Sequence, residues 1–253
     1  MRVQPSLKIG VALAVGYMAL FGMLVKMSGV GYDDLTSTAD NALKGLVIPM
    51  AIVTVVLLVV TSILGWWKPV VRDQKRAKGW VIVVPIVMAF TVFAGVNYSG
   101  LSEFDSKLLL WIGIGAALVG LSEELMYRGL IIVSFRSTMK ESHVWLWSSV
   151  AFALLHSINV LLGQGGIATV QQVVVTFVIG SGLYIARRTT GLIVVPMVLH
   201  LVWDYSSFTA GDYVLSGLLS YVAFGTVLVA LVFGHKLLFA PADAGTVAGN
   251  ATA

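Results

Sequence analysis

The sequence predicts an all-α fold, a polytopic membrane helix bundle with about eight transmembrane helices. Of the 253 residues, 58% are hydrophobic and 11% are charged, and the mean hydropathy is +0.94. Soluble domains carry about 45–50% apolar and roughly 25% charged residues, so this chain has too few charges to cover a surface in water. Its 26 Gly and 7 Trp also suit membrane helices and their interfaces.

Two further features of the composition exclude classes of function. The chain contains no cysteine, which rules out disulfide scaffolds, thiolate metal sites and cysteine nucleophiles. Its formal net charge is +4, but basic residues in a membrane protein mostly determine topology. We therefore expect the lipid bilayer as its surroundings and no nucleic-acid partner.

Eight segments are apolar enough to cross a hydrocarbon layer of ~30 Å, which takes about 20 helical residues. They are residues 9–27, 45–67, 80–99, 108–135, 143–162, 168–186, 192–208 and 215–239. The first is read as a retained helix, because its apolar stretch is long and no clear A-x-A cleavage site follows. The second has no charged residue, and the third is bounded by Trp80 and Tyr98, as at a membrane interface.

The later spans differ in what they carry. The fourth, fifth and seventh contain ionisable residues, the sixth ends at the pair Arg187 and Arg188, and the eighth precedes a tail of small residues. Such a tail cannot bury enough apolar surface to fold by itself. We therefore expect a membrane-embedded helical domain at residues 1–239 and a disordered cytoplasmic tail at 240–253.

The lysine and arginine residues in the connections predict the orientation. The end of the bundle that carries the N-terminus holds twelve of them, and the opposite end holds three. The connection at 68–79 alone has five basic residues and one aspartate. Because cytoplasmic loops carry the excess of Lys and Arg, we predict that both termini lie inside (N-in, C-in). The expected localisation is the cell membrane, as a multi-pass protein.

Six ionisable residues remain inside the predicted spans: Glu123, Glu124, Arg128, His156, His200 and Asp204. A charge at membrane depth costs about 2.5–3.5 kcal/mol, and such residues indicate a functional site by default. At a rise of about 1.5 Å per residue, the acidic and histidine side chains on all three helices lie roughly 15–21 Å from the cytoplasmic helix ends. We therefore predict that carboxylates and imidazoles meet at one depth.

The spacing along each helix indicates which side chains share a face. His200 and Asp204 are four residues apart, so they lie on one face. Glu124 and Arg128 have the same spacing and can form an ion pair. Glu123 is rotated by about 100° from Glu124 and is free for other chemistry. We assign the Glu124–Arg128 pair an orienting role and Glu123 the chemical one, because a carboxylate beside an imidazole can deprotonate a water or share a metal that does so.

Three short motifs occur in order on three of the predicted spans: EELMYR at 123–128, FALLH at 152–156 and HLVWD at 200–204. They match the patterns EExxxR, FxxxH and HxxxN/D. In these motifs the chain resembles the CPBP family of intramembrane proteases, also called the ABI family, which includes the type II CAAX prenyl endopeptidases. The resemblance covers a protease-like core at about residues 108–208.

The resemblance implies an eight-helix bundle that hydrolyses a peptide bond in a water-filled cavity open towards the cytoplasm. By the match, Glu123 and His156 would activate the water, and Glu124 with Arg128 would support them. The implied partner is a peptide or membrane-protein substrate, and the implied enzyme is a CPBP-type endopeptidase, a hydrolase.

By the same match, His200 and Asp204 would bind or polarise the scissile carbonyl. The prenyl endopeptidases typically have Asn at the last motif position, which can donate a hydrogen bond, whereas an ionised Asp204 can only accept one. Three explanations stay open: Asp204 is protonated by burial, it orients His200, or it helps to hold a metal.

Metal dependence is a second open point. The family is often described as metalloproteases, and a metal-free glutamate mechanism is the competing account. Glu123, His156, His200 and Asp204 are the candidate ligands, and two histidines with a glutamate would suit zinc. The motif HExxH is absent from the sequence. We favour a metal-free site and keep zinc as the alternative.

The same residues allow functions other than hydrolysis. Intramembrane carboxylates and histidines also serve proton relays, so the alternative is a proton-coupled carrier, or a non-enzymatic binding or immunity membrane protein. A degenerate relative that only scaffolds other membrane proteins is a third reading. No inverted repeat or pair of broken helices is evident, which disfavours a transporter, and the complete motif set disfavours a scaffold.

Overall fold

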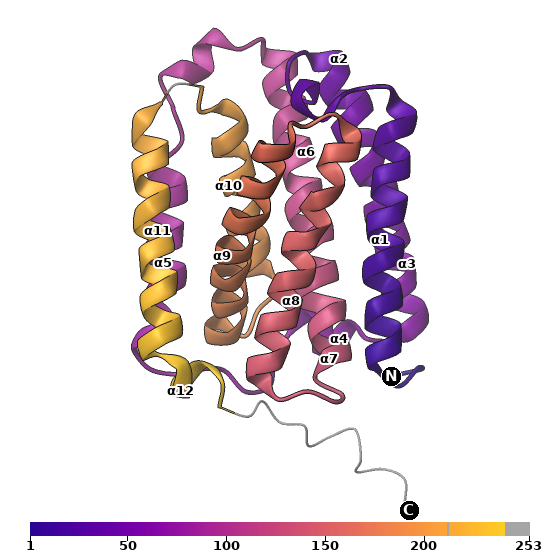
Figure 1. Ribbon diagram of the computed structural model, residues 1–253, viewed down its shortest axis with the longest axis vertical. Helices are drawn as coiled ribbons and strands as arrows, with labels where there is room; N and C mark the ends of the chain where they lie inside the picture. Colours follow the sequence, from indigo (N-terminus) through magenta and orange to yellow (C-terminus); the bar gives the residue numbers. More distant parts are fainter. Residues whose placement is uncertain (212, 241–253) are drawn as a thin grey trace, which may run out of the picture.

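The computed structural model describes residues 1–211 and 213–240, and this part of the chain is a bundle of helices (Figure 1). The α-helices are α1 Leu7–Ser28, α2 Ala39–Asn41, α3 Ile48–Leu64, α4 Trp67–Val71, α5 Val83–Ala94, α6 Ser106–Glu124, α7 Ile132–Phe135, α8 Glu141–Leu155, α9 Gly166–Thr190, α10 Val194–Thr209, α11 Val214–Phe233 and α12 His235–Leu238. Short 3-10 helices are η1 Tyr32–Asp34, η3 Trp80–Ile82, η4 Gly100–Glu103 and η6 His156–Leu162, and π-helices are η2 Ala42–Val47 and η5 Leu125–Ile131.

Among the described residues, six helical segments are long and apolar enough to cross a membrane. They are Leu7–Ser28, Ala39–Leu64, Ser106–Phe135, Glu141–Leu162, Gly166–Thr190 and Val214–Phe233. Trp80–Ala94 and the 16-residue α10 are shorter. Within the described residues no strand is present, apart from one isolated bridge between Arg72 and Leu192. The predicted all-α, polytopic membrane bundle is confirmed. The count of eight spans and the N-in, C-in orientation stay predictions, and the predicted tail lies outside the described residues from 241 onwards.

The helix predicted at residues 80–99 ends at Ala94 instead. Gly95 caps this end, and beyond it Asn97 Oδ1 accepts hydrogen bonds from the Gly100 backbone N–H and the Ser99 hydroxyl, each at 3.1 Å. An asparagine side chain that bonds to nearby groups in this way offers the backbone an alternative to the helix. The chain therefore leaves the helix before η4.

Close packing of α6 against α10 brings two of the motifs together. A Cβ atom added to Gly120 would lie 2.7 Å from the carbonyl oxygen of Met197 and 3.0 Å from the backbone nitrogen of Leu201. Only a glycine allows two helix backbones to approach this closely. The contact lies one turn before Glu123 on α6 and one turn before His200 on α10, so it sets the separation of these side chains.

The helix of the first motif changes its winding at the site. Glu124 ends the regular α-helix α6, and the π-helix η5 follows directly. Wider π turns inside helices are frequent at functional sites. Here the turn carries Tyr127 and Arg128, both of which are buried. Helical spacing alone did not predict this turn.

A buried network of ion pairs ties the connections together at the end of the bundle that holds the N-terminus and α12 (Figure 1). Asp73 pairs with Arg136 at 2.9 Å and with Arg187 at 2.8 Å. Glu141 pairs with Arg136 at 2.7 Å and with Arg188 at 3.3 Å. Three of the arginines counted above as topology signals are therefore also structural, because they hold α9 to the connections at 72–79 and 136–140.

Candidate active site

The six ionisable residues predicted to form a site lie on three stretches of helix. They are Glu123 and Glu124 at the end of α6, Arg128 in η5, His156 at the start of η6, and His200 with Asp204 on α10. The structure connects five of them by direct hydrogen bonds or ion pairs. The sixth, His156, lines the same cavity as Glu123, His200 and Asp204.

Glu124 lies at the centre of the buried part of the site. Its Oε1 accepts a hydrogen bond from Arg128 Nη1 at 2.8 Å and another from His200 Nδ1 at 2.9 Å. Arg128 Nη2 also donates to the carbonyl oxygen of Gly180 on α9, at 3.0 Å. Because Nδ1 of His200 donates to Glu124, Nε2 is the nitrogen that faces the rest of the site.

Glu123 has a different environment from its neighbour. Its Oε2, like Oε2 of Glu124, is buried and has no hydrogen-bond partner among the described residues, but Glu123 lines the cavity and Glu124 is not among its lining residues. Glu123 Oε2 lies 3.9 Å from His200 Nε2. Buried polar atoms without a partner are rare in folded proteins and call for an explanation, such as an unseen water or a catalytic role. One oxygen of Glu123 is therefore available to a molecule in the cavity.

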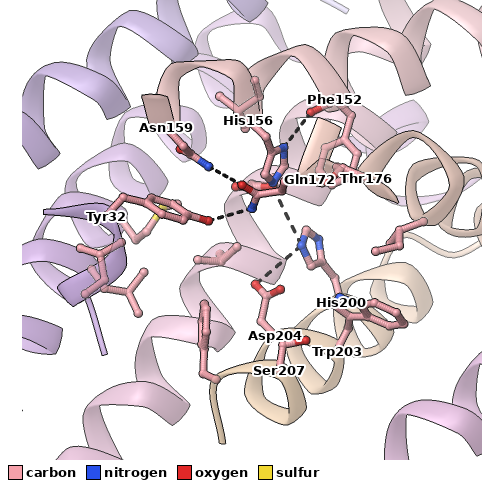
Figure 2. Close-up of a pocket in the computed structure, with 18 of the residues that line it drawn as sticks. Tyr32, Phe152, His156, Asn159, Gln172, Thr176, His200, Trp203, Asp204 and Ser207 are labelled. Carbon is pink, nitrogen blue, oxygen red and sulfur yellow. Dashed lines mark hydrogen bonds and ion pairs between the residues drawn. The ribbon is translucent and has the colours of Figure 1, made fainter. Parts of the chain in front are cut away.

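Asp204 faces the same nitrogen of His200 from the other side. Its Oδ2 lies 3.7 Å from His200 Nε2, and its side chain is 17% exposed, against 5% for the imidazole. Glu123 and Asp204 thus both lie near His200 Nε2, with Asp204 the more exposed of the two; Figure 2 shows Asp204 beside His200.

Phe152 joins the second motif to the other two. The guanidinium carbon of Arg128 lies 3.9 Å from the centre of the Phe152 ring. The same ring meets the imidazoles of His156 and His200 edge to face, with centroids 5.3 and 5.6 Å apart. The sequence motif includes this residue, but its role as the common packing surface for both histidines and the arginine was not predicted.

The orientation of His156 follows from one hydrogen bond. Its Nδ1 lies 3.1 Å from the carbonyl oxygen of Phe152. A carbonyl oxygen only accepts, so Nδ1 carries the hydrogen and Nε2 has a free lone pair. Among the described residues, the structure records no hydrogen bond or ion pair between His156 and Glu123. The two side chains, which were expected to act as partners, can therefore act together only through a molecule between them.

A cavity of about 230 Å³ lies beside these groups and is lined by Glu123, His156, His200 and Asp204. Since liquid water occupies about 30 Å³ per molecule, the cavity has room for several waters. Most of its remaining wall is apolar and includes Phe21, Leu46, Met50, Leu155, Trp203 and Phe208. Figure 2 shows His156, His200 and Asp204 around this common space.

The cavity extends towards the end of the bundle that lies opposite the N-terminus. Tyr32, Leu35 and Thr36 line it, and they belong to the connection between α1 and α2, at the top of Figure 1. The basic connections counted above lie at the other end. The N-in orientation predicted from Lys and Arg would place this wall of the cavity towards the outer face, whereas the resemblance implies a cavity open towards the cytoplasm; both orientations stay predictions.

Three polar residues of the cavity were not found from the sequence. Asn159 donates to Gln172 at 2.9 Å, and Gln172 donates to the hydroxyl of Tyr32 at 2.8 Å. A polar amide inside the apolar segment 168–186 is a signal that could have indicated Gln172. Tyr32 lies 140 residues away in a connection, and nothing in its local sequence indicates this contact.

The candidate metal ligands of the site are not grouped as zinc ligands are. Zinc sites use three or four Cys, His, Asp or Glu ligands in tetrahedral geometry. Within residues 1–211 and 213–240, no three His, Asp or Glu side chains are grouped so that they could hold a metal ion. The candidate ligands therefore do not fit zinc as they are arranged here.

Comparison with known proteins supports the resemblance found in the motifs. Residues 105–206 match the family model described as type II CAAX prenyl endopeptidase, Rce1-like. The match includes all six site residues and ends within α10. No curated protein and no solved structure matches the chain.

Proposed function

We propose that the chain hydrolyses peptide bonds within the membrane, because residues 105–206 match the family model of the Rce1-like type II CAAX prenyl endopeptidases. Glu123 and His156 activate the attacking water, and His200 polarises the scissile carbonyl. The proposed localisation is the cell membrane.

One observation carries this proposal. A buried carboxylate oxygen of Glu123 has no partner among the described residues, and the cavity beside it has room for water. A general base must lie within hydrogen-bond reach of the proton that it removes. Water in the cavity satisfies this condition for Glu123, and His156 Nε2, with its free lone pair, offers a second acceptor for the same water.

The proposed steps need no group outside the chain, the water and the substrate. Glu123 takes a proton from the water, whose oxygen attacks the carbonyl carbon, and the carbonyl oxygen becomes negatively charged. The tetrahedral intermediate then collapses, the C–N bond breaks, and Glu123 returns the proton to the leaving amine. Glu124 acts through His200, whose ring it holds with Nε2 towards the cavity.

The substrate is a peptide or a membrane-protein segment that enters the cavity from the bilayer or its surface. The largely apolar wall fits an apolar side chain or an attached isoprenoid better than a charged group. Cleavage of matched peptides with and without an isoprenoid group tests which of the two the cavity prefers.

The test of the proposed function is the variant Glu123→Gln, which keeps the shape of the side chain and removes its basicity. We expect it to fold and insert normally and to lose cleavage by the purified protein in proteoliposomes. Glu103→Gln, in the connection before α6, is the matched control and should cleave normally. Full cleavage by Glu123→Gln would contradict the proposal, and movement of protons or solute without cleavage would favour the carrier alternative.

A further inference from the structure

A chain of three hydrogen-bonded side chains lies in the cavity wall nearest to the α1–α2 connection (Figure 2). Asn159 Nδ2 donates to Gln172 Oε1 at 2.9 Å, and Gln172 Nε2 donates to Tyr32 Oη at 2.8 Å. The three residues come from η6, α9 and η1. This chain of hydrogen bonds fixes the hydroxyl group of Tyr32 at the wall of the cavity.

The hydrogen bonds in this chain run in one direction. An amide nitrogen only donates and an amide oxygen only accepts, so Asn159 donates to Gln172, which in turn donates to Tyr32. The oxygen of Tyr32 therefore acts as an acceptor. Its own hydrogen has no acceptor among the described residues, which leaves a positioned O–H donor for a group inside the cavity.

Tyr32 lies within electrostatic reach of the site. Burial raises the pKa of Tyr32 to about 12, the hydrogen bond from Gln172 opposes this rise, and the negative charges of Asp204 and Glu123 add to it. The phenol therefore keeps its hydrogen at neutral pH. Its hydroxyl and the two carboxylates share one electrostatic environment.

The Nδ1 donors of both site histidines are already in use. His200 Nδ1 donates to Glu124, and His156 Nδ1 donates to the carbonyl of Phe152. A carbonyl attacked by water develops negative charge on its oxygen, and a preorganised donor stabilises that charge. His200 Nε2 is the group that the proposed function assigns to this oxygen, and the carboxylates beside it only accept when ionised, so a further donor has to come from outside the three motifs.

We propose that Tyr32 donates its phenolic hydrogen bond to the scissile carbonyl oxygen, and that Gln172 and Asn159 are positioning residues that turn this donor into the cavity. The proposal rests on the proposed endopeptidase function and adds a residue from outside the three motifs. Tyr32 keeps its proton throughout, and its hydrogen bond strengthens as the oxygen becomes negative. The donor that an ionised Asp204 cannot supply thus comes from the α1–α2 connection.

Two variants separate a donor from a simple tether between the connection and α9. Tyr32→Phe removes the hydroxyl and keeps the ring. Gln172→Glu keeps the contact but reverses its direction, because the carboxylate accepts the Tyr32 hydrogen and draws it away from the cavity. Since loss of one such donor costs about 10²–10³-fold in kcat, we expect roughly a hundredfold lower kcat in both, with KM changed only a few-fold. The double variant should be no worse than either single one.

A tether would give a different result. Gln172→Glu would then keep near-normal kcat, because the contact remains, and Tyr32→Phe would mainly lower the thermal midpoint or raise KM. Tyr98→Phe, which removes a hydroxyl bonded to the Phe93 carbonyl in a connection at the same end, is the control and should leave kcat unchanged.

Three results would overturn the proposal. One is a kcat within about threefold of wild type in Tyr32→Phe. Another is near-normal kcat in Gln172→Glu. A third is a large loss of kcat in Thr176→Val or Ser207→Ala instead of in Tyr32→Phe; these two variants remove other hydroxyls of the cavity. If Glu123→Gln is inactive while Tyr32→Phe is active, the endopeptidase function stands and only this inference falls. A wild-type protein that cleaves no peptide overturns both.

Discussion

Nδ1 of His200 lies 2.9 Å from Oε1 of Glu124, the same oxygen that accepts a hydrogen bond from Arg128. His200 on α10 and Arg128 in η5 therefore both donate to one buried oxygen atom of Glu124, at the end of α6. Neighbouring Glu123 makes no such contact through its Oε2. Two adjacent glutamates thus have separate physical tasks, one in the fold and one at the cavity.

This division predicts that two conservative variants differ in their effect on stability. Glu124→Gln leaves the buried guanidinium of Arg128 without its counter-ion, and loss of one partner of a buried pair costs about 3–5 kcal/mol. We expect its thermal midpoint in detergent to fall by several degrees, with cleavage also reduced because His200 loses its charged partner. Glu123→Gln should keep the wild-type midpoint and lose only cleavage. Equal midpoints for the two variants would contradict the assignment of separate tasks.

Metal removal should leave cleavage unchanged. Because no three described His, Asp or Glu side chains are grouped to hold a metal ion, we expect purified protein to contain less than stoichiometric zinc. Strong chelators should not lower kcat, whereas they inactivate enzymes that depend on a bound catalytic metal. Stoichiometric zinc together with activity that is lost on chelation and restored by zinc would show that this prediction is wrong.

Much of the candidate site could be predicted because helix spacing reports both face and depth. The Glu124–Arg128 pair and the shared face of His200 and Asp204 follow from four-residue spacing. Their meeting in space was expected from similar depths on three helices. What spacing could not predict is which atom faces which. Glu123 lies near His200 and makes no recorded hydrogen bond or ion pair with His156, the partner that was expected.

Other contacts could not be predicted from the sequence, for physical reasons. A count of lysines and arginines indicates the side of the membrane but not the partner of each charge, so the network around Asp73 and Arg187 was not foreseen. The contact of Tyr32 with Gln172 joins residues 140 positions apart, and it depends on how a connection folds back over the cavity. Local sequence carries no signal for such a contact.

The packing of α6 against α10 predicts a strong effect of the smallest possible substitution. In Gly120→Ala the new Cβ would lie 2.7 Å from the carbonyl oxygen of Met197, so the helices must separate. We expect a destabilisation of about 1–3 kcal/mol, as for other overpacked sites, and a clear loss of kcat. Gly217→Ala on α11 meets nothing within 4 Å and should be neutral or slightly stabilising. Similar thermal midpoints and kcat for both variants would refute this role of Gly120.

The buried network around Asp73 predicts a dependence of stability on pH. Burial by itself raises the pKa of Asp73, but the guanidinium groups of Arg187 and Arg136 more than offset this and hold the pKa below its usual value. A carboxyl group whose pKa is lowered on folding stabilises the fold above its ordinary pKa of about 4, and this contribution is lost as the pH falls through the lower folded-state value.

Asp73→Asn should therefore be less stable than wild type at pH 7, by about 3–5 kcal/mol for a broken buried ion pair. The difference in unfolding free energy between the two proteins should shrink as the pH is lowered below about 4. Glu103→Gln provides the comparison for an acid outside the network. A difference that stays constant or grows on acidification would mean that Asp73 is not held ionised by its arginines.

The direction in which the cavity opens can be measured, because the chain has no cysteine of its own. Gln74→Cys lies in the basic connection and Ser102→Cys in η4 at the cavity end, and neither changes a charge. If the excess of Lys and Arg marks the cytoplasmic side, a membrane-impermeant maleimide added to intact cells labels Ser102→Cys, and it labels Gln74→Cys only after permeabilisation. We expect this result, because twelve basic residues against three is a large imbalance.

Thr36→Cys, at the cavity wall, should then be labelled from outside as well, and a substrate would have to enter from that face. The reverse pattern would show that the cavity faces the cytoplasm, as the family resemblance implies, and that the ion-paired arginines Arg136, Arg187 and Arg188 are retained for the fold and not for topology.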